Sequence, residues 1–142
     1  MALSLIIYFL VDYPLKFNTW NGRFVNRIIS EVLESANVKI SHSAKVKPFT
    51  STPVLALGNK VVKELIPGNQ YWFRVSLFCS EVDCGSIIDA FTQPMLKLST
   101  GESLSIIRTS VINKDFSRKN VNEGPIVVHW RVRFWPTSFI FR

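Results

Sequence analysis

The chain opens with a segment whose apolar residues occupy both faces of a β-strand. Successive residues of a strand point to opposite sides, so residues 3–11 (LSLIIYFLV) present two rows. One row contains Leu3, Leu5, Ile7, Phe9 and Val11, and the other contains Ile6, Tyr8 and Leu10. A strand that is apolar on both sides is typical of the centre of a sheet. We therefore predict a central first strand here, and not a leader peptide, because no Lys or Arg precedes the apolar run.

Two later segments have apolar residues at helical spacing. Residues 19–36 repeat them every three or four positions, which predicts an amphipathic helix. Asn18 or Thr19 can cap the start of this helix, and Asn37 can end it. Residues 81–92 predict a second, weaker helix, because Gly85 lowers its helix propensity and Pro94 ends it.

The remaining apolar segments have the pattern of strands. We predict strands at residues 53–57, 61–65, 70–79, 96–98, 103–113 and 126–135. With the helices, they give the order β-α-β-β-α-β and one further strand, which is the order of a ferredoxin-like α+β sandwich. Such a fold places two helices on one face of an antiparallel sheet. The open face is expected to carry Ile6, Tyr8, Leu10, Trp72 and Phe78.

This order of elements also divides the chain. Residues 1–125 are predicted to form the ferredoxin-like domain. Residues 126–142 are predicted to form either the first strand of a truncated second domain or a dimerisation strand, and their apolar end predicts association with a partner. Trp72 and Trp130 are expected to face the core or a partner, in preference to stacking on nucleic-acid bases.

Composition and charge narrow the class of partner. Of the 142 residues, 47% are hydrophobic and 19% are charged, which excludes an intrinsically disordered chain. The net charge is +7, and it is unevenly distributed: residues 16–63 carry +6, residues 64–104 carry −3, and residues 105–142 carry +5. Two basic segments around an acidic one favour a polyanion such as nucleic acid, and the alternative is a solvated basic surface.

Other motifs are absent from the sequence. It contains no P-loop, no GxGxxG, no HExxH and no zinc-ligand spacing, so neither a metal nor a cofactor is expected. No apolar run is long enough to span a bilayer, so we expect no membrane association. Cys79 and Cys84 are expected to be reduced, half-buried thiols, which fits a cytoplasmic protein.

Three groups of residues, in order along the chain, are similar to the motifs of one family. Lys47 to Pro53 reads KPFTSTP, similar to a KPFTFSP segment. Residues 65–74 contain LIPG and YWFR, similar to an L-x-P-G-x-x-Y-x-F-R turn and strand. Residues 131–134 (RVRF) lead into Pro136-Thr137, similar to the strand and S-P-T that open a second domain. The chain thus resembles the CRISPR repeat-RNA-processing endoribonucleases of the RAMP superfamily, and in particular their N-terminal ferredoxin-like domain.

This resemblance implies metal-independent cleavage of RNA, in which a 2′-hydroxyl attacks the adjacent phosphate and leaves a 2′,3′-cyclic phosphate. It implies that His42 transfers protons and that Lys45 or Lys47 supplies positive charge. The RNA-binding residues expected beside them are Arg23, Arg27, Lys39, His129, Arg131 and Arg133. Residues 129, 131 and 133 share one strand face, which is either a phosphate-contacting stripe or the polar side of an edge strand.

Three functions are compatible with the sequence. The first is an endoribonuclease that processes CRISPR repeat RNA. The second is a catalytically inactive RNA-binding remnant that forms a homodimer. The third is an adaptor that binds a RAMP-type complex through its open apolar face and its C-terminal tail without contacting RNA. The basic segments favour the first two functions over the third.

Overall fold

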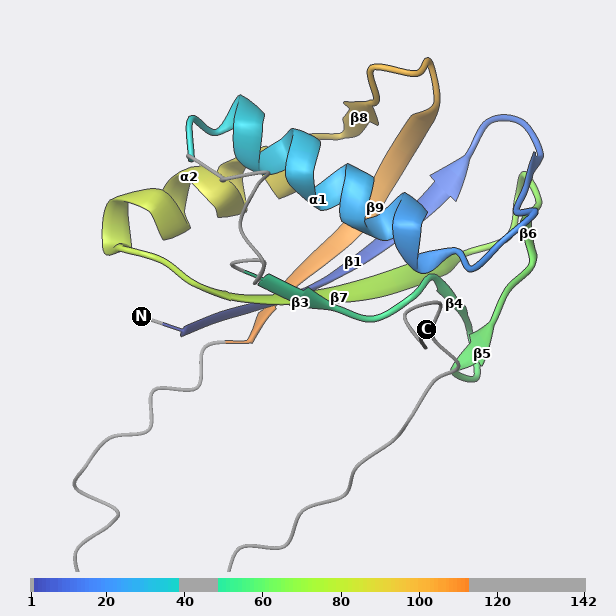
Figure 1. Ribbon diagram of the computed structural model, residues 1–142, viewed down its shortest axis with the longest axis horizontal. Coiled ribbons are helices and arrows are strands. Elements are labelled where there is room, and N and C mark those ends of the chain that lie inside the picture. The colour runs from blue at the N-terminus through green and yellow to red at the C-terminus, as the bar shows by residue number, and fades with distance from the viewer. Residues whose placement is uncertain (1, 39–48, 113–142) are drawn as a thin grey trace, which may run out of the picture.

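A computed structural model describes residues 2–38 and 49–112 of the chain (Figure 1). The predicted strand at residues 126–135 and the predicted unit 126–142 lie outside these residues, and so does the boundary at residue 125. The described helices are α1 (Gly22–Ser35) and α2 (Glu81–Phe91). The strands are β1 (Ala2–Val11), β2 (Leu15–Lys16), β3 (Phe49–Ser51), β4 (Leu55–Ala56), β5 (Lys60–Val61), β6 (Glu64–Leu65), β7 (Tyr71–Phe78), β8 (Met95–Lys97) and β9 (Ser103–Ile112).

The main sheet is antiparallel and has β1 near its centre. The strands run in the order β5-β4-β7-β1-β9-β8, and β3 also pairs with β7. Short strands β2 and β6 form a separate pair beside it. Figure 1 shows α1 and α2 on the same side of the main sheet. The predicted α+β class, with a ferredoxin-like arrangement of elements, is therefore confirmed for the described residues.

The core lies between the helices and one face of the sheet. From β1 it receives the row that begins at Leu3 and ends at Val11, whose side chains are at most 4% exposed. From β7 it receives alternate residues, and among them Phe73 has its ring centroid 5.9 Å from that of Phe9. Helix α1 covers these residues with an apolar stripe. Its helical spacing predicted Val25, Ile28, Ile29, Val32 and Leu33, and the structure adds Phe24.

The open face carries the second row of β1 and of β7, as predicted. In register, Tyr8 lies opposite Trp72 and Ile6 opposite Arg74. Tyr8 and Trp72 are partly exposed, whereas Phe78, at the end of β7, is 83% exposed. Trp72 is therefore not one of the core residues, and the alternative that it faces a partner stays a prediction.

The start of α1 differs from its prediction. Neither Asn18 nor Thr19 caps the helix, because α1 begins at Gly22 and its N-cap is Asn21. The side chain of Asn21 does not cap the helix either. Its amide nitrogen donates to the carbonyl oxygens of Val54 and Val62 at 3.2 and 2.8 Å, and its carbonyl oxygen accepts from the N–H of Val54 at 3.0 Å. The 2% exposed Asn21 thus joins α1 to the segments around β4 and β5.

The expectation that Cys79 and Cys84 are reduced thiols is wrong. The two residues form a disulfide, with Cα atoms 5.4 Å apart. The physical reason is local, because β7 ends at Phe78 and α2 begins at Glu81, so the turn between them brings the two side chains together. The expectation of half-burial holds for Cys79, which is partly buried, but not for Cys84, which is buried.

We predict that Asn21→Ala destabilises the fold strongly. The substitution leaves the Val54 N–H and the Val62 carbonyl oxygen without the partner that they have at Asn21, while the Val54 carbonyl oxygen keeps a hydrogen bond from the Val62 N–H at 3.5 Å. Unpaired buried groups of this kind cost about 1–3 kcal/mol, so we expect the free energy of unfolding to fall by about 3 kcal/mol. Urea denaturation followed by circular dichroism measures it. Asn69→Ala, at an exposed position, is the matched control, and equal losses in the two variants would contradict the prediction.

Candidate nucleic-acid interface

The structure describes two of the nine site residues that the sequence predicts. His42, Lys45 and Lys47, the expected catalytic residues, lie outside the described residues together with Lys39. His129, Arg131 and Arg133 also lie outside them. The described residues are Arg23 and Arg27, both on α1. The predictions for the other seven therefore stay predictions.

Arg23 and Arg27 line a cavity beside the start of α1. The cavity has a volume of about 440 Å³, and its other walls come from residues 15–20, Phe24 and Glu102. Lys16 and Trp20 stand among them, so the lining combines cations with aromatic rings. Arg23 is exposed to solvent, and Arg27 is partly buried over the ring of Phe24. The two arginines predicted on α1 thus face one cavity but differ in their surroundings.

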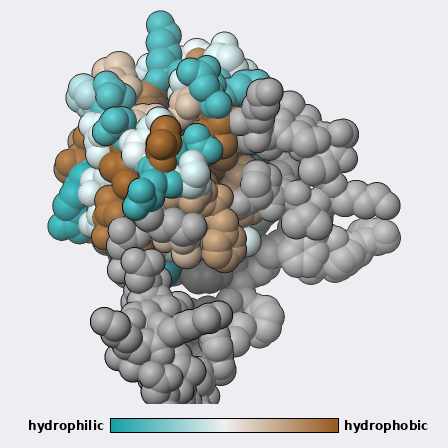
Figure 2. All heavy atoms as spheres, turned by 90° about the vertical axis from the view of Figure 1, so that its left-hand side faces the viewer, coloured by the Kyte–Doolittle hydropathy of each residue, from teal (hydrophilic) through white to brown (hydrophobic). Residues whose placement is uncertain are grey.

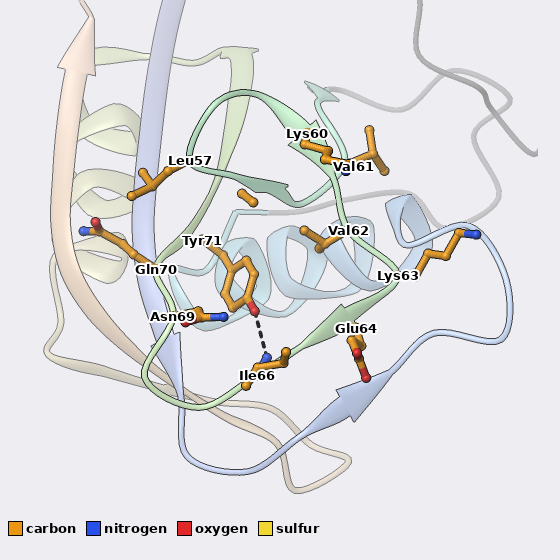
Figure 3. Close-up of a pocket in the computed structure, with 11 residues that line it drawn as sticks. Leu57, Lys60, Val61, Val62, Lys63, Glu64, Ile66, Asn69, Gln70 and Tyr71 are labelled. Atoms are coloured by element: carbon orange, nitrogen blue, oxygen red, sulfur yellow. Dashed lines mark hydrogen bonds between the residues drawn. The ribbon is translucent and has the colours of Figure 1, made fainter.

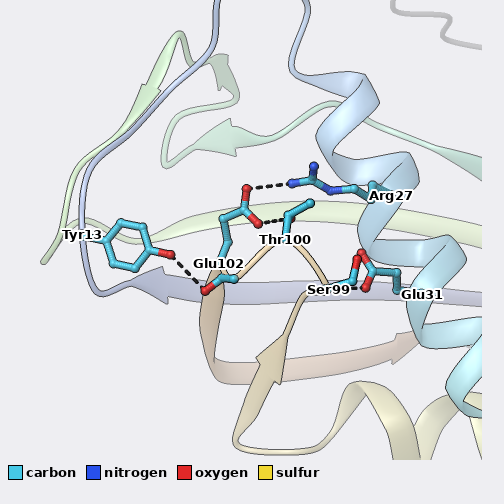
Figure 4. Close-up of polar contacts among 7 residues, drawn as sticks. Tyr13, Arg27, Glu31, Ser99, Thr100 and Glu102 are labelled. Carbon is cyan, nitrogen blue, oxygen red and sulfur yellow. Dashed lines mark hydrogen bonds and ion pairs between the residues drawn. The ribbon is translucent and has the colours of Figure 1, made fainter.

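Arg27 is held by an acidic partner (Figure 4). Its terminal nitrogen lies 2.9 Å from a carboxylate oxygen of Glu102, and the other carboxylate oxygen accepts a hydrogen bond from the Thr100 hydroxyl. One turn further along α1, Glu31 accepts from the N–H of Ser99 at 2.7 Å. These contacts fasten the turn between β8 and β9 to α1. Arg27 therefore has a structural partner, and Arg23 is the more accessible cation of the pair.

The same contacts set the ionisation of Glu102. Partial burial by itself raises the pKa of this carboxyl group. Hydrogen bonds from the Thr100 hydroxyl and the Glu102 backbone, together with the charge of Arg27, outweigh burial and hold the pKa below its ordinary value of 4.5. Glu102 is therefore ionised at neutral pH, as its ion pair with Arg27 requires.

A second cavity lies between the β4–β5 turn and the segment that leads into β7 (Figure 3). Its volume is about 660 Å³, and exposed Leu57 and Ile66 contribute to its apolar lining. The hydroxyl of Tyr71 accepts a hydrogen bond from the N–H of Ile66 at 2.8 Å, which fixes one wall. Lys60 and Lys63 are its cations, and Glu64 is its acid. This cavity includes none of the predicted site residues.

The open face carries two arginines that the sequence-based list of site residues omits. Arg74 and Arg108 are both exposed. The guanidinium carbon of Arg108 lies 4.3 Å from the centroid of the Tyr8 ring, which is a cation–π contact. Arg74 donates to the hydroxyl of Ser4 at 3.2 Å. The alternation of residues 70–79 could have identified Arg74, because it shares a strand face with Trp72.

Some surface features are apolar. Figure 2 views the end of the molecule that lies on the left in Figure 1, and hydrophobic residues are scattered there among hydrophilic ones. At the turn from β7 into α2, Phe78 is 83% and Val82 is 79% exposed.

Within residues 2–38 and 49–112, no group of three or more His, Cys, Asp and Glu side chains could hold a metal ion. No helix in these ranges is long and apolar enough to cross a membrane.

Comparisons with known proteins identify the fold. No family model matches the chain, and no curated protein matches its sequence. Among solved structures, a RAMP protein that binds different RNA substrates matches with a TM-score of 0.51 and 18% identity. The chain has a RAMP-like fold. This match covers 82% of the chain and 51% of the solved structure, so the chain spans about half the length of that protein.

A second solved structure, the CRISPR-associated protein Cas6, matches the chain with a TM-score of 0.49 and 10% identity over the same shares of both chains. In the described part of this RAMP-like fold, α1 carries Arg23 and Arg27 on the helix side of the sheet. Arg74 and Arg108 lie on the opposite side. The accessible arginines are thus divided between two surfaces of the molecule.

We predict that Glu102→Gln makes stability less sensitive to acid. A carboxyl group whose pKa is lowered by folding stabilises the protein above its unfolded pKa, near 4.5, and this contribution disappears as pH falls through the folded pKa. Between pH 6 and pH 3, the variant should therefore lose less stability than the wild type. The difference should stay below about 1 kcal/mol, since the Arg27 side chain is 38% exposed.

Urea denaturation at half-unit steps of pH measures this difference. Glu64→Gln, which removes an exposed carboxyl group, is the matched control. If the curves of stability against pH for Glu102→Gln and the wild type run parallel, ionised Glu102 does not stabilise the folded protein, and the prediction is wrong.

Proposed function

We propose that this protein is a CRISPR-associated RNA-binding protein. The observation that carries the proposal is the overlap of its fold with a RAMP protein that binds RNA, which extends over 82% of the chain. The sequence motifs at residues 47–53, 65–74 and 131–137 support the same family independently, because they depend on residue identity and not on shape. The part of the function beyond RNA binding rests on the motifs alone.

The distribution of charge supports RNA as the partner. The two segments with net charges of +6 and +5 contain most of the lysine and arginine residues. Arg23, Arg74 and Arg108 are exposed, so they can reach a polyanion without first breaking a salt bridge of the described residues. Contacts between such cations and phosphates provide most of the affinity of a protein for nucleic acid, independently of base sequence.

We further propose that the chain cleaves the phosphodiester backbone of RNA, and that this cleavage needs no metal ion. The 2′-oxygen loses its proton and bonds to phosphorus, while the bond from phosphorus to the 5′-oxygen breaks and that oxygen gains a proton. His42 would transfer these protons, because the pKa of histidine lies near neutral pH. Lys45 or Lys47 would stabilise the charge that builds up on the phosphate. The chain contains one other histidine, His129.

The predicted division of the chain belongs to the same proposal. Residues 1–125 would form the RNA-binding domain. Residues 126–142, with His129, Arg131 and Arg133, would add a strand that either begins a second domain or pairs with a second copy. In that arrangement, Lys39 and Arg23 would contact RNA from the side of α1. Arg27 would contribute less to RNA binding, because it forms an ion pair with Glu102.

We predict that RNA binding depends steeply on salt. A protein that neutralises about five phosphates of a single strand should lose about a hundredfold in affinity between 50 and 200 mM KCl. Fluorescence anisotropy of labelled CRISPR repeat RNA measures the affinity at each concentration. The variant Arg23→Gln should reduce the slope of log affinity against log salt, whereas Glu64→Gln should not. If the wild type binds no repeat RNA at 50 mM KCl, the proposed function is wrong.

We predict that His42→Ala slows cleavage and leaves binding unchanged. The imidazole takes part in proton transfer, and proton transfer by a positioned side chain contributes about 10²–10⁴-fold to a rate. Gel analysis of end-labelled repeat RNA in EDTA gives the rate, and the wild-type product should carry a 2′,3′-cyclic phosphate. Asn69→Ala, at an exposed position outside the predicted site residues, is the control. Intact RNA after incubation with the wild type would leave RNA binding in place and contradict cleavage.

A further inference from the structure

Three residues on adjacent strands form a row across the open face. Trp72 on β7 lies opposite Tyr8 on β1, and Tyr8 lies opposite Arg108 on β9. We refer to Trp72, Tyr8 and Arg108 as the stacking row. Neighbouring strands are about 4.8 Å apart, and the guanidinium group of Arg108 lies over the Tyr8 ring, with its carbon 4.3 Å from the ring centroid. The row therefore offers the indole of Trp72 and the guanidinium plane of Arg108, which is supported by Tyr8, as planar surfaces. Such a row is large enough for planar groups of a ligand to lie on it.

A β-bulge puts Arg108 into this row. In the β1–β9 register, Phe9 pairs with Ile106 and Tyr8 pairs with Arg108, so Ile107 has no partner on β1. An extra residue in one strand shifts every later side chain by one position. Without the bulge, Ile107 would lie opposite Tyr8. The extra residue therefore exchanges an aliphatic neighbour of Tyr8 for a cationic one, and the guanidinium carbon lies 4.3 Å from the ring centroid.

The surroundings of the row are cationic and contain hydroxyl groups. Arg74 lies on the same face, opposite Ile6, and donates to the hydroxyl of Ser4. Strands β1, β7 and β9 contain no Asp or Glu at any position. Neither Arg74 nor Arg108 therefore has an acidic partner on these strands. Among the described strands, these two cations are uncompensated, and such a surface complements an anion, while its aromatic rings complement planar apolar groups.

Unpaired nucleotides combine both of these properties. Every base has a π-face that stacks on an aromatic ring or on an arginine plane, and every nucleotide adds a phosphate. A duplex keeps its bases stacked inside, so it cannot offer their faces to a sheet. An acidic peptide would satisfy the arginines but would leave the exposed part of Trp72 without a planar partner.

We propose that the open face binds a single-stranded segment of RNA, with bases stacked on the stacking row and phosphates contacted by Arg74 and Arg108. This inference rests on the proposed function, which requires RNA binding. It moves the main contact from the helix side of the sheet, where Arg27 is paired with Glu102, to the opposite side. It also assigns Trp72 a role in stacking.

The test compares two substitutions of Trp72. Trp72→Leu keeps an apolar side chain but removes the ring, whereas Trp72→Phe keeps a ring. Binding of a fluorescein-labelled 12-nucleotide uridine RNA is measured by anisotropy at 50 mM KCl. Trp72→Leu should weaken binding by between about fivefold and a hundredfold, in keeping with the contribution of one stacked base. Trp72→Phe should stay within about threefold of the wild type and should reduce the quenching of tryptophan fluorescence by RNA.

A second pair of variants tests the charge. Arg108→Gln removes a cation of the open face, and Lys60→Gln removes an exposed cation of β5 outside the stacking row. We expect Arg108→Gln to weaken binding more than Lys60→Gln. Circular dichroism and urea denaturation show whether each variant is folded, and the folded Trp72→Phe variant keeps the test valid if Trp72→Leu does not fold.

The outcomes separate the inference from the proposed function. If the wild type binds neither uridine RNA nor repeat RNA, the proposed function is wrong, and the inference fails with it. Two results together would show that only the inference is wrong in a protein that binds RNA. RNA would quench the tryptophan fluorescence of Trp72→Phe as strongly as that of the wild type, and Arg108→Gln and Lys60→Gln would bind RNA with equal affinity. A dimer that Trp72→Leu converts to a monomer in sedimentation, with unchanged RNA affinity, would make the open face a protein interface and also overturn the inference.

Discussion

The structure depends on how β1 is paired between β7 and β9. Because the side chains of a strand alternate, this pairing sends Leu5, Ile7 and Phe9 into the core and leaves Ile6 and Tyr8 on the other face. A shift of one residue would exchange the two rows. The three inward residues are fully buried, and each contributes about 1.5–3 kcal/mol through burial, so the alternative register would lose several kcal/mol. The position of Tyr8 beside Trp72 and Arg108 is a consequence of this constraint.

Helix α1 is held on the sheet by polar contacts as well as by its apolar stripe. Asn21 joins the start of the helix to the backbone at Val54 and Val62, on the β4 side of the sheet. Arg27 and Glu31 join its middle to the β8–β9 turn, on the other side. Apolar packing alone would allow the helix to slide along the core, since it is not directional. Hydrogen bonds to opposite edges of the sheet fix the position of α1, and with it the cavity that contains Arg23.

Much of the fold could be predicted from the sequence because its patterns are local. The alternation in residues 3–11 and 70–79 and the helical spacing in 19–36 each depend on contacts within one element. Three features could not be predicted, because none of them shows in the pattern of a single helix or strand. Asn21 uses its side chain on a strand segment more than thirty residues away, so it reads as an ordinary residue before a helix. The disulfide depends on the geometry of the turn between β7 and α2, and the position of Arg108 depends on the bulge at Ile107.

The same reason explains which residues of the candidate site could be predicted, because the surroundings of each arginine depend on other elements of the fold. Arg27 looks like an accessible cation on a helical wheel, but Glu102, which lies 75 residues later, neutralises it. Arg108 is one residue in an ordinary strand, but the bulge places it over Tyr8, and the described strands β1, β7 and β9 contain no Asp or Glu. Among the described residues, charge counted along the sequence therefore overestimates the helix side, through Arg27, and underestimates the sheet side, through Arg74 and Arg108. Because free cations determine where a polyanion binds, the open face is the stronger candidate for contact with RNA.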